Sequence, residues 1–279
     1  MKRLTTYLAI SLLLSSLAGC TLEQKLASSF VKTGIKDDFL LMEPGYLFKY
    51  NLKTYEVPEL DSIPEELRDS ILIEKSLFLR SINDSVLIKT FSDRFVAGLK
   101  KYNINIYPEN YLDTFLATGR TANVLHLAQF SLEEYVHPYT REEVVDEEIV
   151  VIDGIDLNAL NFNIWLELSP LNYQGKQKVL FGTDYLLDGL QGMLKQYFFT
   201  GEMSFDFTID TIRLAQVYKF AGEFGERTAG YLYDYYLNRY ITENLPADYQ
   251  FERYYYHYDP VRNSVYPVEP EESLIELRK

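Results

Sequence analysis

The side chains best suited to acid–base or nucleophilic chemistry are few in this sequence of 279 residues. It has three histidines, His126, His137 and His257, and a single cysteine, Cys20. Serine and cysteine hydrolases pair a histidine with the nucleophile, and the sequence contains no G-x-S-x-G, H-E-x-x-H, P-loop or G-x-G-x-x-G pattern. We therefore expect packed or surface histidines, a non-enzymatic protein and no cofactor.

Acidic residues gather in two places that could hold a metal ion. Glu133, Glu134 and His137 lie close in sequence, but they fall in an expected strand before Pro138, where neighbouring side chains point to opposite faces. The acids from Glu142 to Glu148 lack the glycine and the alternate spacing of an EF-hand calcium loop. We expect a solvated strand end and a solvated loop, without a metal site.

Tyrosine is unusually frequent, since 24 Tyr and 17 Phe accompany a single Trp. Tyr254, Tyr256 and Tyr258 alternate near the C-terminus, which would place three rings on one face of a strand. Such a face either packs on the body with its hydroxyls reaching water, or stacks on a sugar or a partner protein. The three residues are therefore a candidate contact site for a partner or a glycan.

Charge and composition exclude other classes of function. The chain has 27 basic and 41 acidic residues, a formal charge of −14, so it would repel nucleic acids and anionic lipid headgroups over much of its surface. A hydrophobic content of 47% excludes wholesale disorder. One cysteine cannot form an internal disulfide or a cysteine-rich zinc site. We therefore expect a folded protein that does not bind nucleic acid.

The first 20 residues have the layout of a secretory signal. A basic start at Lys2 and Arg3 precedes a short apolar run over 7–14, which is shorter than the ~20 residues that cross a bilayer. The segment Leu17-Ala18-Gly19-Cys20 resembles the lipobox of bacterial lipoproteins. The resemblance implies cleavage before Cys20 and attachment of lipid (diacylglycerol, with palmitate-type acyl chains) to its thiol. The mature chain would have 25 basic and 41 acidic residues, a charge of −16.

The same resemblance implies an address in the cell envelope. Lipoproteins of this kind carry three acyl chains, and more than one chain makes membrane anchoring durable. Thr21 stands where some enterobacterial lipoproteins have the aspartate that retains them in the inner membrane, which implies the outer membrane. Residues 21–25 also lack the acidic cluster that marks surface export in some groups, which favours the periplasmic face.

The hydrophobic pattern divides the chain into successive segments. Leu22, Leu26 and Phe30 at fourfold spacing predict a turn or two of helix in an otherwise extended tether. The expected division is a signal peptide over 1–19, a lipid-anchored tether over 20–36, an α/β body with hairpins over 37–208, a helical segment over 209–250, and a Tyr-rich hairpin with a charged tail over 251–279.

The body alternates between helical and extended patterns. The spacing predicts a helix over 92–101, a strand over 104–107, a helix ending at Gly119 and a long strand over 124–135. That order favours an α/β or α+β fold, a mixed sheet with helices packed on it and at least one parallel pair of strands. This stretch distantly resembles the α/β modules of envelope accessory lipoproteins, such as auxiliary components of ABC transport systems and the curli-secretion group. The resemblance implies a non-enzymatic, partner-binding role.

Several later segments are less uniform. Asp153-Gly154 after an apolar run is typical of a hairpin turn, and residues 187–199 suit either a helix or the first strand of a hairpin, of which we favour the hairpin. Residues 210–243 form the longest helical pattern. Its small residues Ala221, Gly225 and Ala229 would let another element approach closely. Gly222 and Gly225 predict a break or kink near them, which would divide the segment into two helices.

These observations favour an outer-membrane lipoprotein that acts as an accessory component of an envelope complex. Two alternatives stay open. A carbohydrate-binding lipoprotein would expose its C-terminal tyrosines in a groove. A glycan hydrolase would bring two carboxylates to a separation of about 5–9.5 Å in a cleft.

Overall fold

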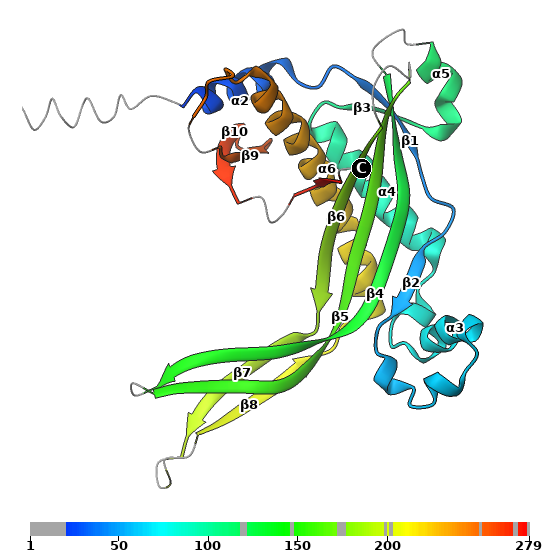
Figure 1. The fold of residues 1–279 in the computed structure, drawn as a ribbon, viewed down its shortest axis with the longest axis vertical. Coiled ribbons are helices and arrows are strands. Elements are labelled where there is room, and N and C mark those ends of the chain that lie inside the picture. The colour runs from blue at the N-terminus through cyan, green and yellow to red at the C-terminus, as the bar shows by residue number, and fades with distance from the viewer. Residues whose placement is uncertain are drawn as a thin grey trace, which may run out of the picture.

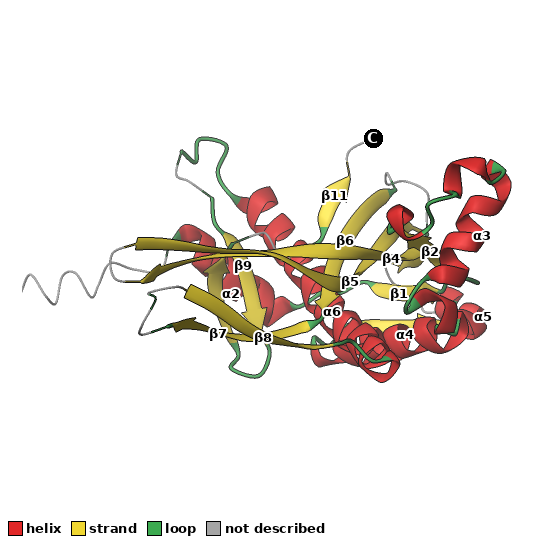
Figure 2. Ribbon diagram, turned by 90° about the horizontal axis from the view of Figure 1, so that it is seen from below, coloured by secondary structure: helices red, strands yellow, loops and turns green. Residues whose placement is uncertain are grey.

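The computed structural model describes residues 21–117, 122–145, 148–171, 177–197, 200, 203–250, 253–269 and 273–277. A mixed sheet carries helices on one face, and paired hairpins extend from one end of the molecule (Figures 1 and 2). Cys20 and the lipobox lie outside the described residues. The mixed α/β fold predicted from the sequence is confirmed.

Seven strands form the main sheet. In sheet order they are β11 (Ile275–Leu277), β6 (Lys178–Leu187), β5 (Glu148–Pro170), β4 (Ala122–Val145), β1 (Asp38–Met42) and β3 (Asn105–Pro108), and β2 (Phe48–Asn51) also pairs with β4. β1 runs parallel to both β3 and β4, and β2 runs parallel to β4. The other pairs are antiparallel. The expected parallel pairing is therefore confirmed.

Five α-helices and two further hairpins complete the described fold. The helices are α2 (Leu22–Thr33), α3 (Glu65–Lys75), α4 (Asp84–Lys101), α5 (Leu112–Leu116) and α6 (Leu214–Asn244), with short 3-10 turns at Thr54–Glu56, Leu60–Ser62, Leu79–Ser81 and Glu109–Tyr111. β7 (Gly189–Gln196) pairs with β8 (Met203–Asp210), and β9 (Tyr255–Asp259) pairs with β10 (Ser264–Val268). Both hairpins were predicted. No helix in the described part of the chain has the length and apolar character to cross a membrane.

The sheet has one apolar face because its central strand alternates. In β5, Phe162, Ile164 and Leu166 are buried, while Asn161 and Trp165 point to the other face. Side chains with a period of two separate cleanly into two faces in this way. α4 and α6 cover the apolar face (Figure 1), and their Phe91 and Phe224 join the rings of Phe130 and Phe162.

Small residues bring α4 and α6 into close contact. A Cβ on Gly98 of α4 would lie 2.6 Å from the Cβ of Ala229, and a Cβ on Gly225 of α6 would overlap the carbonyl oxygen of Phe91. The close approach predicted for this helix is therefore confirmed at Gly225 and Ala229. The predicted break is wrong, because α6 runs as one helix of 31 residues. Packing against α4 offsets the weak intrinsic helix propensity of its glycines.

The segment expected to be a tether is part of the folded body. α2 packs along α6 and buries Ala27 and Phe30, whose ring lies 5.5 Å from that of Tyr233. The side chain of Thr21 caps the helix by accepting from the amide of Gln24. The predicted boundary at residue 37 is therefore wrong. The spacing of Leu22, Leu26 and Phe30 predicted the helix but not what it packs against.

One further prediction is wrong, and one strand was not predicted. Asp153-Gly154 is not a hairpin turn but lies inside β5, where the two residues oppose Thr140 alone, between the pairs Tyr139↔Ile155 and Arg141↔Ile152. Gly154 has φ 77°, the left-handed conformation that a bulge of this type needs. Within the expected charged tail, residues 275–277 form β11 at the edge of the main sheet, an element that was not predicted.

Candidate functional site

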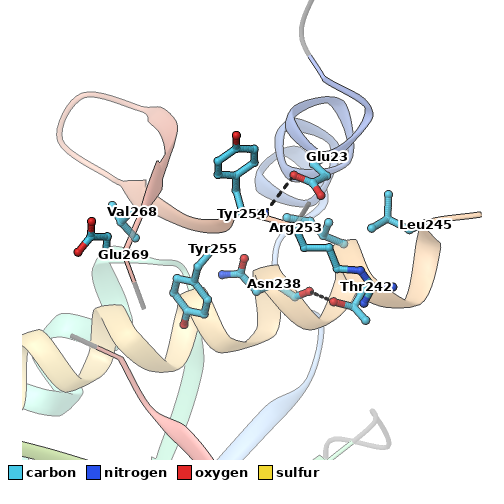
Figure 3. A pocket seen from close by; sticks show the side chains of 10 residues that line it. Glu23, Asn238, Thr242, Leu245, Arg253, Tyr254, Tyr255, Val268 and Glu269 are labelled. Carbon is cyan, nitrogen blue, oxygen red and sulfur yellow. Dashed lines mark hydrogen bonds between the residues drawn. The ribbon is translucent and has the colours of Figure 1, made fainter. Parts of the chain in front are cut away.

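Three adjoining pockets form a groove between α6 and the β9–β10 hairpin. Their volumes are about 560, 400 and 450 Å³. Tyr255 and Glu269 line both the first and the second pocket, and Tyr231 and His257 line both the second and the third. The first pocket extends past the ring of Tyr254 to the end of α6 (Figure 3). The pockets therefore follow one face of α6 and share their boundaries.

The hairpin is held in place by polar side chains of α6. Asn238 donates to the carbonyl of Tyr256 at 2.7 Å and accepts from the amide of the same residue at 2.8 Å. One turn earlier, Asp234 accepts from the amide of Tyr258 at 3.0 Å. Positions 234 and 238 share a helix face. Their side chains therefore supply the hydrogen bonds that a neighbouring strand would otherwise make to the free edge of β9.

Asp234 also pairs with His257, and this pair lies in the wall of the groove. Nδ1 of His257 lies 2.6 Å from Oδ2 of Asp234, whose side chain is 3% exposed. The hydrogen bond to Asp234 raises the pKa of His257, against the opposing effect of its burial. Burial raises the pKa of Asp234, although the contact with His257 opposes that rise. The groove therefore contains a hydrogen-bonded carboxylate–imidazole pair in which both pKa values are raised.

The chemistry of this pair is limited by its neighbours. An aspartate bonded to Nδ1 orients the imidazole so that Nε2 can act as a base. The described residues that line the second and third pockets include no serine, threonine or cysteine. These pockets therefore do not form a nucleophilic triad around His257. Their lining by tyrosines and carboxylates suits reversible binding.

The three candidate tyrosines do not share one exposed face. Tyr256 is 3% exposed, and its hydroxyl lies 3.3 Å from Oε2 of Glu23. Tyr258 is half-buried, with its ring 5.2 Å from that of Tyr233. Tyr254 precedes β9 and is 55% exposed. The candidate contact role is therefore corrected for Tyr256, which packs in the core, and only Tyr254 presents most of its ring to solvent and the first pocket.

Glu133, Glu134 and His137 do not form a metal corner. Glu134 is fully buried and forms an ion pair of 3.1 Å with Lys53. It also accepts from the amides of Leu77, Phe78 and Leu79. Glu133 lies on the opposite face and accepts from Asn161. The described residues contain no cluster of three or more metal-binding side chains. Glu134 instead joins the segment after α3 to the sheet.

The remaining sequence candidates lie elsewhere. His126 contacts Glu167 at 3.3 Å on the outer face of the sheet, where both are partly exposed. His137 lies in β4 without a metal partner among the described residues. Of the acids between Glu142 and Glu148, those after Glu142 fall on residues whose side chains are outside the described part of the chain. They add nothing to the groove.

A second feature is an arm made of two hairpins, which we define as residues 136–145 of β4, 148–158 of β5, and all of β7 and β8. β6 pairs with β5 only between Ala159 and Leu168, so the outer part of the β4–β5 hairpin extends beyond the main sheet (Figure 1). Eleven residues of β5 lie in this part, a length of about 36 Å. The arm therefore reaches well beyond the helices.

Apolar side chains join the two hairpins and also remain exposed on them. Ile155 and Leu157 are buried against Leu190, Leu194 and Phe205. The cluster packs the hairpins together. Four further apolar side chains of β7, β8 and their connection are between 39% and 61% exposed: Met193, Tyr197, Phe207 and Ile209. In the register of this hairpin Met193 pairs with Asp206 and Phe207 pairs with Gly192, so Met193 and Phe207 lie on opposite faces. Both faces of this projecting element therefore carry exposed apolar groups that a partner could cover.

Neither the groove nor the arm was predicted from the sequence. Asp234 and Asn238 carried a usable signal, because they place two polar residues four apart on a helix that is otherwise rich in buried apolar and aromatic residues. His257 was named without its partner because the two residues are 23 positions apart in the sequence. The arm had a weaker signal, in the long extended patterns on either side of residues 146 and 147.

Comparisons with known proteins give no relative. No family model, no curated protein and no solved structure matches this chain. The groove and the arm are therefore interpreted from the chemistry and geometry of this chain alone.

Proposed function

We propose that this protein is a lipoprotein anchored through Cys20 to the periplasmic face of the outer membrane. It acts there as a non-enzymatic accessory component that binds another envelope protein through the arm. The observation that carries this proposal is the arm itself, a projection with exposed apolar groups. The sequence Leu17-Ala18-Gly19-Cys20 supports the anchor.

The arm is suited to binding because it is both projecting and internally supported. A lone two-stranded hairpin is marginally stable in water. Here the buried cluster around Ile155 and Leu157 holds two hairpins together, so the arm can present a defined surface. β7 and β8 form a separate two-stranded sheet, and β6 pairs with β5 only outside the arm. Strands of the arm therefore have edges without a partner strand in the described part of the chain. Open edges and exposed apolar groups are features that a protein partner covers.

The arm also points away from the anchored end. α2 lies near one end of the longest axis of the molecule, and the far ends of β7 and β8 lie near the other (Figure 1). A protein anchored beside α2 would therefore extend its arm toward the periplasmic space. This orientation fits a component that recruits or stabilises a partner at a distance from the membrane.

The test is crosslinking and affinity capture from intact envelopes with the full-length protein. A Met193→Ser, Phe207→Ser variant removes two exposed apolar side chains of the arm. Leu67→Ser is the matched control, because Leu67 of α3 is also 53% exposed. We expect the arm variant to lose a reproducibly captured envelope protein that the control retains. Equal capture by both variants would contradict a role of the arm.

A carbohydrate-binding role is the second candidate, and the groove favours it. Tyr254 and Tyr255 line the first pocket together with Asn238 and Glu269. Aromatic rings beside hydrogen-bonding side chains are the groups that hold sugars. Binding of envelope glycans to wild-type protein and to Tyr254→Ala tests it. Glycan binding that depends on Tyr254 would favour this role, and its absence at millimolar glycan would exclude it.

A further inference from the structure

The link between Cys20 and the folded body is too short to act as a spacer. Thr21 is the only residue between Cys20 and the first residue of α2, Leu22. Two residues of extended chain span at most about 7 Å, so the link itself allows little separation between an anchor on Cys20 and the start of α2. α2 itself is fixed, because Phe30 packs against α6 and the hydroxyls of Thr21 and Tyr256 are 3.2 Å apart. Lipid on Cys20 would hold this end of the body at the bilayer.

α2 has one buried and one exposed face. Glu23, Ala27 and Phe30 point toward the body. The exposed residues Leu22, Lys25, Ser29 and Lys32 follow the spacing of three and four that places them on one opposite face. We call these four residues the outer face of α2. It consists of an apolar residue next to Cys20, two cations and a small polar residue.

The charge of this region is opposite to that of the rest of the protein. Residues 21–36 contain Lys25, Lys32 and Lys36 against the single acid Glu23, a formal charge of +2. Residues 37–279 contain 22 basic and 40 acidic residues, a charge of −18. An anionic surface would attract the first region and repel the second. The positive charge of residues 21–36 and the lipid on Cys20 would therefore both turn the α2 side of the molecule toward an anionic membrane.

We infer that the outer face of α2 lies on the surface of the membrane, where Lys25 and Lys32 bind anionic lipid headgroups. This inference rests on the proposed function, since it takes Cys20 as the anchor. Leu22 enters the interface beside the acyl chains, as apolar residues of surface helices do. The lysines extend toward the headgroups. The membrane thereby orients the protein, and the acidic body and its arm are turned away from it.

The experiment uses the full-length lipidated protein in vesicles of phosphatidylcholine with or without phosphatidylglycerol. Spin labels are placed on Ser29→Cys in the outer face or on Thr208→Cys, an exposed position of the arm. Cys20 is the only native cysteine, so lipidation leaves the introduced thiol as the sole labelling site. Collisions of each label with a water-soluble nickel complex are then compared.

We expect a several-fold lower collision rate for the label at residue 29 than for the label at residue 208. Phosphatidylglycerol should lower the rate at residue 29 further, and Lys25→Glu with Lys32→Glu should reverse that effect. Equal rates at both positions would overturn the inference. Protein without an introduced cysteine is the control for the anchor itself. If its Cys20 takes up the label, Cys20 carries no lipid and the proposed anchor is wrong. If its Cys20 stays unlabelled and the two rates are equal, only the inference about α2 is wrong.

Discussion

Asp234 of α6 and His257 of β9 form a hydrogen bond of 2.6 Å that ties the C-terminal hairpin to the longest helix. The second carboxylate oxygen of Asp234 accepts from the amide of Tyr258, so both oxygens are used by β9. The carboxylate is buried, whereas the imidazole lines two pockets of the groove. The protonation of His257 is therefore coupled to the docking of the hairpin.

The first prediction concerns pH. The contact with Asp234 raises the pKa of His257 in the folded state above its unfolded value of about 6.5. The stabilisation from this contact is fully present below about pH 6.5 and is lost as the pH rises through the folded pKa. We expect the free energy of unfolding, measured with urea between pH 5.5 and 8.5, to fall with increasing pH.

Two variants show whether the pH dependence of the free energy of unfolding comes from the contact between Asp234 and His257. Asp234→Asn should flatten the pH dependence above pH 6 and lower stability by about 1–3 kcal/mol, because a hydrogen bond to a charged group is lost. His126→Gln is the control, since His126 contacts Glu167 on the outer face of the sheet. An unchanged slope in Asp234→Asn would contradict the assignment.

The second prediction compares two glycines of α6. A Cβ on Gly225 would overlap the backbone carbonyl of Phe91, which cannot move without shifting α4. We expect Gly225→Ala to lower stability by about 1–3 kcal/mol through overpacking. A Cβ on Gly222 would meet the side chain of Arg94 at 3.2 Å, and this side chain is exposed and able to move. Gly222→Ala should be neutral or stabilising by up to about 1 kcal/mol. Urea denaturation of both variants measures the difference.

The sequence predicted local elements better than their partners. Phe162, Ile164 and Leu166 alternate with polar residues, so a strand with one apolar face followed from local pattern alone. The fate of residues 153 and 154 did not, because a glycine at positive φ serves a turn and a bulge equally well. Asp234 and His257 also could not be paired, since their contact depends on the hairpin folding back onto α6. Glu134 posed the same difficulty, because its burial depends on Lys53, which is 81 positions away.

The third prediction concerns this buried pair of Lys53 and Glu134. Both side chains are at most 2% exposed, and Glu134 also accepts three backbone amides. Lys53→Met leaves a buried charge without its cation, which costs about 3–5 kcal/mol. Adding Glu134→Gln removes that charge and should recover part of the loss. A thermodynamic cycle of the two single variants and the double variant measures the coupling, and strictly additive effects would contradict it.

The last prediction tests whether α2 belongs to the body, on which the orientation at the membrane depends. The ring of Phe30 lies 5.5 Å from that of Tyr233 and 5.3 Å from that of Tyr240, and Phe30 is 7% exposed. Phe30→Ala removes a buried aromatic side chain and should lower global stability by about 3 kcal/mol. Val31→Ala, at a partly exposed position next to it, is the control and should cost less than about 1 kcal/mol. If α2 were a tether, it would unfold independently of the core. Both variants would then unfold at the same urea concentration as the wild type. A large loss in Phe30→Ala alone requires that α2 is docked, so that lipid on Cys20 holds the body itself at the membrane.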